Sequence, residues 1–198
     1  MFVKNKPVIF GIQGGVGSFN EEATNSYCLK RGIITYKMKY LYTTARVLEA
    51  VENNTVDYGI FAIHNSVGGV VWESARALAE YRVRLLEEFY IVITHHLMKR
   101  PDVSFSSIKK IVAHPQVFKQ CSQNLKKFFP NLEQISGEGD YIDTAKAAEA
   151  VSKGILPKNY AVLGPKSLSA LYNLEVVKSD LQDLKTNKTY FFLVSRYS

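Results

Sequence analysis

The chain has 198 residues, of which 46% are hydrophobic, 22% are charged and 12% are aromatic. This composition is typical of a globular protein and excludes collagen-like, coiled-coil and disordered chains. The formal net charge of +7 favours anionic partners, but the cations are dispersed and no basic arm or zinc-finger spacing occurs, so nucleic-acid binding is not predicted.

The first elements alternate strand and helix. Residues 8–12 read as a short apolar strand that ends in the turn Gly14-Gly15-Val16-Gly17, and Ser18 is predicted to cap a helix that extends to Lys30. The alternation continues with a strand over 35–41, a helix capped by Thr43-Thr44 and ending near 53, and a strand over 58–63. Strands separated by helices indicate a parallel sheet.

The segment His64-Asn65-Ser66-Val67-Gly68-Gly69 is predicted to be a polar loop directly after a buried strand. In an α/β sheet this is where side chains are presented to a ligand. A helix near 73–81 follows. The alternation over 85–97 then predicts a long strand that runs from one lobe into another.

The second half of the chain repeats the pattern. It predicts strands over 108–113, 132–135, 160–163, 175–177 and 189–195, and helices over 115–128, 145–153 and 165–172. We therefore expect two small, Rossmann-like α/β lobes with a central cleft, a preferred place for small ligands. Lobe 1 is predicted to hold residues 1–97 plus 179–198, and lobe 2 residues 98–178.

Several classes of chemistry lack their sequence patterns. The histidines do not have metal-ligand spacing, the glycine turn lacks the Gly-x-Gly-x-x-Gly order, and no Gly-x-Ser-x-Gly motif occurs, so neither a metal, a dinucleotide cofactor nor a covalent nucleophile is predicted. One of His95 and His96 is expected to form a buried hydrogen bond. The polar residues that remain suit binding and proton relay at a small oxygen-rich anion, and they are Ser18, Asn20, His64, Asn65, Ser66, His114, Gln116, Thr144 and Thr189.

The two cysteines, Cys28 and Cys121, are far apart in the sequence. They are predicted to be free thiols in a reducing cytoplasm. The start of the chain does not have the pattern of a signal peptide, and no apolar run approaches the roughly 20 residues that a bilayer requires. We therefore expect a soluble protein that does not contact membranes.

Five ordered segments resemble the prephenate dehydratase family over nearly the whole chain. In the first half, Gly17-Ser18-Phe19-Asn20-Glu21 is similar to that family's Gly-Thr-Phe-Ser-Glu, and the run from Asp57 to Ser66 is similar to its Asp-Tyr-Gly-Val-Val-Pro-Ile-Glu-Asn-Ser. In the second half, His114-Pro115-Gln116 followed by Gln120-Cys121, then Asp143-Thr144-Ala145, and finally Asn187-Lys188-Thr189-Tyr190-Phe191 stand at the family's other three motifs.

The resemblance implies a fold like that of type II periplasmic binding proteins, a site in the cleft, no metal or organic cofactor, and a homodimer. It implies conversion of prephenate to phenylpyruvate, water and carbon dioxide, a step of phenylalanine biosynthesis. The family's regulatory ACT domain, which binds phenylalanine, has no counterpart before the last residue, Ser198. Feedback inhibition through such a domain is therefore not expected.

The resemblance also implies roles for individual residues. Thr189 would hydrogen-bond to the departing hydroxyl and help to protonate it, while Asn65 and Gln116 would orient the ring substituents. Carboxylate or keto oxygens would be held by Ser18, Ser66 and Thr144, and Asn20, His114 and Tyr190 complete the predicted binding set.

Two positions depart from the family pattern, because His64 replaces a glutamate and Tyr190 replaces an arginine. Loss of the guanidinium removes a fork suited to a carboxylate, whereas histidine in place of glutamate changes the local charge in the opposite sense. The hypothesis is that the two changes compensate in part. His64 is either an acid or a cationic partner of a carboxylate, or else a loop histidine in a hydrogen bond between the lobes.

The sequence leaves three other outcomes open. These departures are compatible with a prephenate decarboxylase that retains the ring hydroxyl. A catalytically degenerate chain could instead bind a small carboxylate without turnover. A preference for arogenate, which carries an amine in place of the keto group, is the third.

Overall fold

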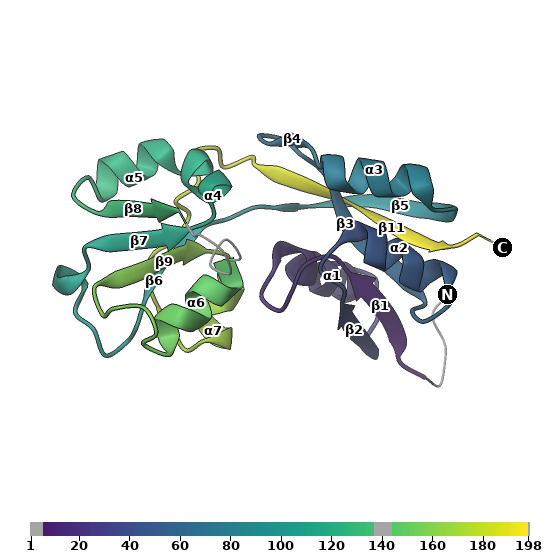
Figure 1. Cartoon of the computed structure of the whole chain (residues 1–198), viewed down its shortest axis with the longest axis horizontal. Helices are drawn as coiled ribbons and strands as arrows, with labels where there is room; N and C mark the ends of the chain where they lie inside the picture. Colours follow the sequence, from purple (N-terminus) through teal and green to yellow (C-terminus); the bar gives the residue numbers. More distant parts are fainter. Residues whose placement is uncertain (1–5, 137–143, 198) are drawn as a thin grey trace. The chain divides into compact units, whose positions relative to one another are not determined.

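The computed structural model describes residues 6–136 and 144–197. The chain divides into two compact units, unit 1 with residues 1–92 and 188–198, and unit 2 with residues 93–187 (Figure 1). The predicted class, two α/β lobes, is confirmed. In the described residues, none of the helices is both long and apolar enough to span a membrane.

Unit 1 contains one mixed sheet with helices on both faces. Its strands, in the order β2-β1-β3-β11-β5 with β4 paired to β3, are β2 (Tyr36–Tyr40), β1 (Val8–Ile12), β3 (Tyr58–Asn65), β11 (Lys188–Arg196), β5 (Val83–Val92) and β4 (Gly69–Val70). The helices are α1 (Phe19–Lys30), α2 (Thr44–Glu52) and α3 (Trp72–Glu80). The three strands β1, β2 and β3 are parallel, as predicted, and β11 joins them in the antiparallel direction.

The two faces of this sheet are covered by different helices because adjacent residues of a strand point to opposite faces. On one face, Tyr27 of α1 packs against Phe89, which stacks on Phe191. On the other face, α2 and α3 pack against Val194 and Phe192 in a cluster of buried side chains. We call these the α1 face and the α2/α3 face.

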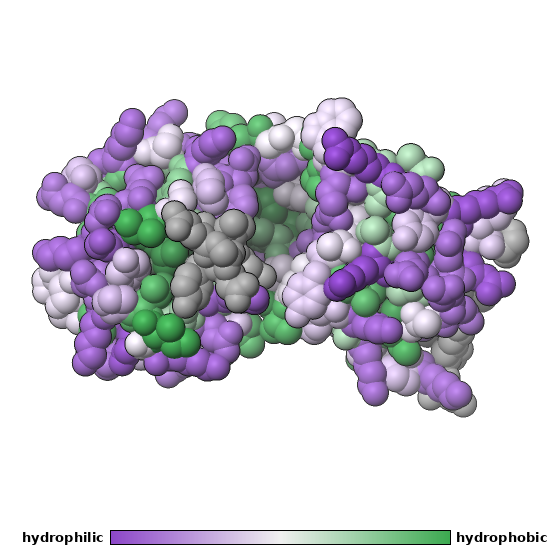
Figure 2. All heavy atoms as spheres, viewed as in Figure 1, coloured by the Kyte–Doolittle hydropathy of each residue, from purple (hydrophilic) through white to green (hydrophobic). Residues whose placement is uncertain are grey.

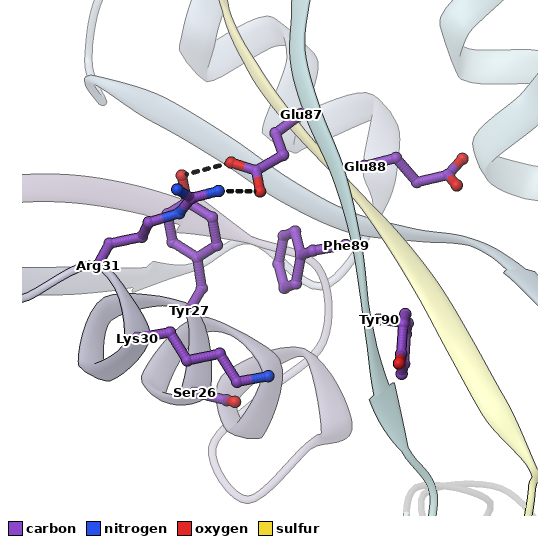
Figure 3. A pocket seen from close by; sticks show the side chains of 8 residues that line it. All are labelled: Ser26, Tyr27, Lys30, Arg31, Glu87, Glu88, Phe89 and Tyr90. Atoms are coloured by element: carbon purple, nitrogen blue, oxygen red, sulfur yellow. Dashed lines mark hydrogen bonds and ion pairs between the residues drawn. The ribbon is translucent and has the colours of Figure 1, made fainter.

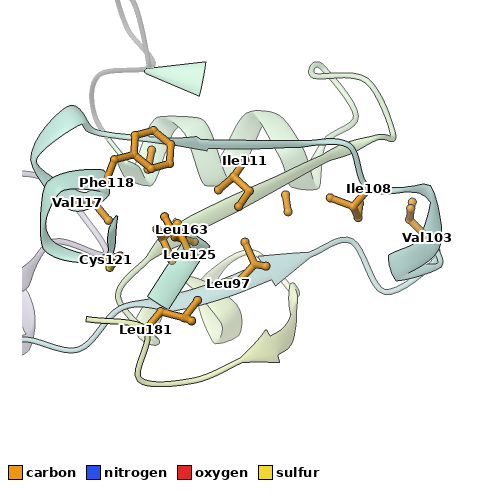
Figure 4. Close-up of a cluster of buried hydrophobic side chains, with 12 residues drawn as sticks. Leu97, Val103, Ile108, Ile111, Val117, Phe118, Cys121, Leu125, Leu163 and Leu181 are labelled. Carbon is orange, nitrogen blue, oxygen red and sulfur yellow. The ribbon is translucent and has the colours of Figure 1, made fainter. Parts of the chain in front are cut away.

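Unit 2 contains a second sheet, of order β10-β6-β9-β7-β8, and its own hydrophobic core (Figure 4). The strands are β10 (Glu175–Lys178), β6 (His96–Lys99), β9 (Tyr160–Gly164), β7 (Lys110–Ala113) and β8 (Glu133–Ser136). The helices are the 3-10 turn η1 (Phe105–Ser107), α4 (Pro115–Gln120), α5 (Ser122–Phe128), α6 (Thr144–Ser152) and α7 (Ser167–Leu171). Hydrophilic side chains cover much of the visible face of each unit (Figure 2).

The boundaries between the units differ from the predicted ones. The predicted long strand over 85–97 is two strands, since β5 pairs with β11 in unit 1 whereas β6 pairs with β9 and β10 in unit 2. Residues 179–187 also belong to unit 2, because Leu181 N–H donates to the carbonyl of His95 and Asp183 accepts the N–H groups of Gln123 and Asn124. Backbone pairing between distant segments, which periodicity does not report, sets the boundaries at 92/93 and 187/188.

Two other expectations are corrected. His64 and Asn65 are not in a loop: they end β3, and β4 folds back on them as a hairpin. The predicted helix over 115–128 is interrupted at Cys121, whose φ and ψ of −119° and 9° leave the helical region, and α5 starts afresh. The Asp183 carboxylate satisfies the first N–H groups of α5, which makes the restart possible.

Candidate functional site

The end of β3 and the start of β11 bring Asn65 and Thr189 together in unit 1. The two residues are paired directly across the antiparallel strands, although they are 124 positions apart in the sequence. Asn65 Nδ2 donates a hydrogen bond of 2.8 Å to Thr189 Oγ1. Because Oγ1 accepts this bond, the hydroxyl proton of the buried Thr189 is directed elsewhere and can be donated to a ligand.

Asn65 and Ser66 are held rigidly by the backbone around them. Asn65 Oδ1 accepts the N–H groups of Val67 at 2.9 Å and Gly68 at 2.7 Å, which closes the β3–β4 turn. The Ser66 hydroxyl accepts the N–H of Lys188 at 2.8 Å, and the Ser66 N–H donates to the carbonyl of Lys188 at 2.8 Å. The amide that contacts Thr189 is therefore preorganised.

His64 and Tyr190 lie on the other face of the same strands. They are also direct cross-strand neighbours, with ring centres 5.8 Å apart. His64 precedes Asn65 by one residue, and Tyr190 follows Thr189 by one residue. Because adjacent residues of a strand point to opposite faces, both rings point to the α2/α3 face while the Asn65–Thr189 pair is on the α1 face. The two residues that depart from the family pattern therefore contact each other in the structure.

The ring pair continues across the sheet. Tyr90 of β5 is paired with Tyr190, with ring centres 5.6 Å apart, and the Lys188 ammonium lies 4.0 Å from the centre of the Tyr90 ring. We call His64, Tyr190 and Tyr90 the aromatic row. Neither Tyr90 nor Lys188 was predicted from the sequence as a site residue. Their contacts join strands β5 and β11, which are about 100 residues apart in the chain, so they leave no local sequence pattern.

Ser18 and Asn20 lie at the start of α1, after the glycine turn. Ser18 Oγ accepts the N–H of Glu21 at 3.3 Å, while Glu21 Oε2 accepts the N–H of Gly17 at 2.5 Å, a reciprocal cap. Gly14 has a φ of +82°, and a Cβ there would lie 3.1 Å from Ser18 Oγ, so the turn requires glycine. Asn20 Oδ1 is buried and has no hydrogen-bond partner in the described part of the chain, so it can accept a bond from a ligand.

The other predicted site residues are in unit 2. His114 caps α4, and its Nδ1 accepts the N–H of Gln116 at 3.0 Å. Thr144 begins α6, and its methyl group lies 2.6 Å from the position that a Cβ on Gly164 would take. These residues follow or adjoin the carboxyl ends of β7 and β9, which are parallel neighbours, the edge where α/β sheets bind ligands. Asp143 lies outside the described residues.

The predicted buried histidine bond is confirmed. His95 is 1% exposed, and its Nε2 lies 2.6 Å from Gln120 Oε1. Burial lowers the pKa of His95 to about 4, with the Gln120 bond acting in the opposite direction. Burial also lowers the pKa of His96. Both histidines are therefore neutral at pH 7 and belong to the framework of unit 2.

This burial predicts a pH-dependent stability. The unfolded chain protonates His95 near pH 6.5, whereas the folded chain does so only near pH 4, so the free energy of unfolding falls as the pH drops through that window. The expected loss is roughly 2–3 kcal/mol. Denaturant titrations of wild type and His95→Gln between pH 7 and pH 4 measure it. Equal pH slopes for the two proteins would remove His95 from the explanation.

Comparisons with known proteins agree with the family resemblance of the five sequence motifs. The family model described as prephenate dehydratase matches residues 10–198. The chain is 31% identical to a bifunctional chorismate mutase/prephenate dehydratase of Buchnera aphidicola over 94% of this chain and 47% of that protein. It is 28% identical to a prephenate dehydratase of Methanocaldococcus jannaschii over 97% of this chain and 65% of that protein. The chain thus spans between about half and two thirds of the length of these relatives.

A solved structure of a prephenate dehydratase is also similar to this chain. The prephenate dehydratase of Arthrobacter aurescens in complex with L-Phe superposes with a TM-score of 0.84 at 27% identity, covering 96% of this chain and 61% of that one. Because the family model covers almost the whole sequence and the motifs that it shares frame the Asn65–Thr189 pair, this chain belongs to the prephenate dehydratase family.

Proposed function

We propose that this chain is a prephenate dehydratase, a lyase that converts prephenate to phenylpyruvate, water and carbon dioxide in phenylalanine biosynthesis. The observation that carries the proposal is the 2.8 Å bond from Asn65 to Thr189 Oγ1, which leaves the threonine proton available to a ligand. Membership of the family supports it.

The proposed chemistry uses this proton at the leaving hydroxyl. The bond between the quaternary ring carbon and its carboxylate breaks, and its electron pair enters the ring as carbon dioxide departs. The ring becomes aromatic as the opposite C–O bond breaks, and the hydroxyl leaves as water after taking up one proton through Thr189. The sum is redox-neutral, so the proposal requires no electron carrier. Positioning and fixed dipoles supply the rate enhancement.

The remaining polar residues are proposed to hold the substrate. Ser18, Asn20 and Ser66 of unit 1 offer hydroxyl and amide groups at the edge where β1 and β3 end. His114, Gln116 and Thr144 of unit 2 are proposed as further substrate-binding residues, with Gln116 orienting a ring substituent. This assignment is supported by the family motifs in which the three residues occur.

His64 and Tyr190 are proposed to act as positioning residues. Their rings meet each other on the α2/α3 face, so a cross-strand ring pair takes the place of a glutamate–arginine pair and holds β3 beside β11. This geometry supports the hypothesis of compensation, because both charges are absent together. A proton donated by His64 would have to come from the face opposite Thr189.

Exchange of the pair tests this role. His64→Ala is expected to lower kcat less than tenfold. The double variant His64→Glu/Tyr190→Arg should be more stable than the sum of its single variants by about 0.5–1 kcal/mol, because cross-strand opposite charges attract. A kcat loss of 10²–10⁴-fold in His64→Ala, the size expected for a general acid, would instead make His64 the proton donor.

The product assay tests the function itself. Purified protein is incubated with prephenate or with arogenate, and the product is identified by mass spectrometry and by its ultraviolet absorbance in alkali. Phenylpyruvate from prephenate is the expected result. A decarboxylated product that keeps its ring hydroxyl would select the non-aromatising alternative, and binding without product would select a degenerate carboxylate-binding chain.

We also propose that the chain acts in the cytoplasm as a homodimer. Cys28 and Cys121 are buried free thiols, which supports a reducing compartment. Around the aromatic row, Val70, Tyr90 and Val92 are 44%, 45% and 41% exposed, and burial of such an apolar face supports association. Sedimentation equilibrium measures the mass, and a monomer at micromolar concentration would contradict the dimer.

A further inference from the structure

A second candidate site lies within unit 1, at a cavity of about 370 Å³ between the last turns of α1 and strand β5 (Figure 3). Helix α1 contributes Ser26, Tyr27 and Lys30, and Arg31 directly follows it. Strand β5 contributes Glu87, Glu88, Phe89 and Tyr90, and the Glu88 carboxylate points away from α1 (Figure 3). The volume is within the 300–1,000 Å³ range of small-molecule sites. Asn65 and Thr189 are not among the lining residues.

The polar side chains of one wall of this cavity bind one another. The Arg31 guanidinium forms an ion pair with Glu87, and the Tyr27 hydroxyl donates to Glu87 Oε2 at 3.1 Å (Figure 3). The charges of Arg31 and Glu87 cancel. Burial and the Glu87 carboxylate raise the pKa of Tyr27 to about 12, so the phenol stays neutral. This wall has shape but offers no net charge to a ligand.

Lys30 and Ser26 are the polar groups left in the cavity on the helix side. In the described residues, neither has an ion pair or a side-chain hydrogen bond with another residue, and Figure 3 shows the ammonium and the hydroxyl close together on the same side of α1. Together they offer donors to a single carboxylate. A second carboxylate would have no further cation and would approach Glu87.

The opposite side of the cavity is aromatic. The Phe89 ring lies 4.8 Å from the Tyr27 ring centre, and it stacks on the fully buried Phe191 at 5.7 Å with an interplanar angle of 23°. Contacts on both sides hold Phe89 in place. Phe89 therefore offers a fixed apolar surface to a ring, which prefers offset-stacked or edge-to-face contact.

We propose that this cavity binds a small ring-bearing monocarboxylate, with its carboxylate at Lys30 and Ser26 and its ring against Phe89. The ligand class follows from one unpaired cation, one hydroxyl and one aromatic surface in a cavity of this size. The proposal does not depend on the proposed dehydratase activity, because it concerns other residues and its test involves no turnover.

The test is a backbone amide chemical-shift titration of the full chain with 3-phenylpropionate. Saturable shifts are expected at residues 26–31 and 87–90, with a Kd on the order of 1–10 mM for a ligand of this size. The uncharged 3-phenylpropanamide should bind about fivefold more weakly. No saturation, or shifts confined to the neighbourhood of Asn65 and Thr189, would overturn the proposal.

Matched lysine variants locate the charge. Lys30→Met should weaken 3-phenylpropionate about fivefold and make the acid and the amide bind alike, since only the charge contact is removed. Lys37→Met changes an exposed lysine of β2, at the opposite edge of the sheet, and should bind both ligands as wild type does. Both side chains are exposed, so neither variant is expected to unfold. Equal affinities in the two variants would contradict the assignment.

Discussion

Thr189→Val is expected to lower kcat for prephenate by about 10²–10⁴-fold, the range of general acid catalysis. Valine has nearly the shape of threonine but lacks the hydroxyl that accepts from Asn65 Nδ2. The variant therefore loses the oriented proton and leaves the donor of Asn65 without that acceptor. Initial rates of phenylpyruvate formation measure kcat and KM separately, and KM should change much less than kcat.

Thr189→Ser is the matched control. It keeps the hydroxyl and the Asn65 bond, so it should retain turnover within about tenfold of wild type, the remaining loss coming from a freer side chain. Circular dichroism should show both variants folded. Full activity of Thr189→Val would mean that the proton comes from elsewhere and would remove Thr189 from the proposed mechanism.

Phe191→Ala is expected to lower the free energy of unfolding of unit 1 by about 3–5 kcal/mol, because it leaves a cavity where a fully buried ring stacks on Phe89. Trp72, the single tryptophan, lies in unit 1 and reports its unfolding by fluorescence in denaturant. Far-UV circular dichroism follows the unfolding of both units. Because Phe191 lies in unit 1, the denaturant midpoint of a transition that belongs to unit 2 should not change in the variant.

Phe105→Ala serves as the control in unit 2. Phe105 also contacts another ring, that of Phe129, but it is 37% exposed, so its loss should cost only about 1 kcal/mol. Phe191→Leu, which refills most of the cavity, should cost less than half of the alanine value. An alanine variant at 191 with wild-type stability would show that the stacked rings do not support β11.

Much of the fold follows from local pattern. The strand over 8–12 and the Ser18 cap were predictable because a short apolar run that ends in a glycine turn, and a short polar side chain before a helix, are local signals. The parallel order of β1, β2 and β3 follows from the helices that separate them. The break at Cys121 was not predictable, since the carboxylate that permits it belongs to Asp183, about 60 residues later.

The candidate site shows the same division. Its residues could be named from motifs, including His64 and Tyr190 as departures from the family pattern. Their arrangement could not, because it depends on which strand β11 pairs with and in which register. Pairing with β3 sets Asn65 against Thr189 on one face and His64 against Tyr190 on the other.

By itself, the amino-acid sequence determined the α/β class, the order of most elements and the family motifs, since these depend on neighbours within a few positions. Only the tertiary structure decided where one unit ends and the next begins, which face each site residue occupies, and that α1 and β5 line a common cavity. Those features arise from backbone hydrogen bonds and ring contacts between segments far apart in the chain. A shift of one residue in such a pairing would turn every side chain of the strand to the opposite face.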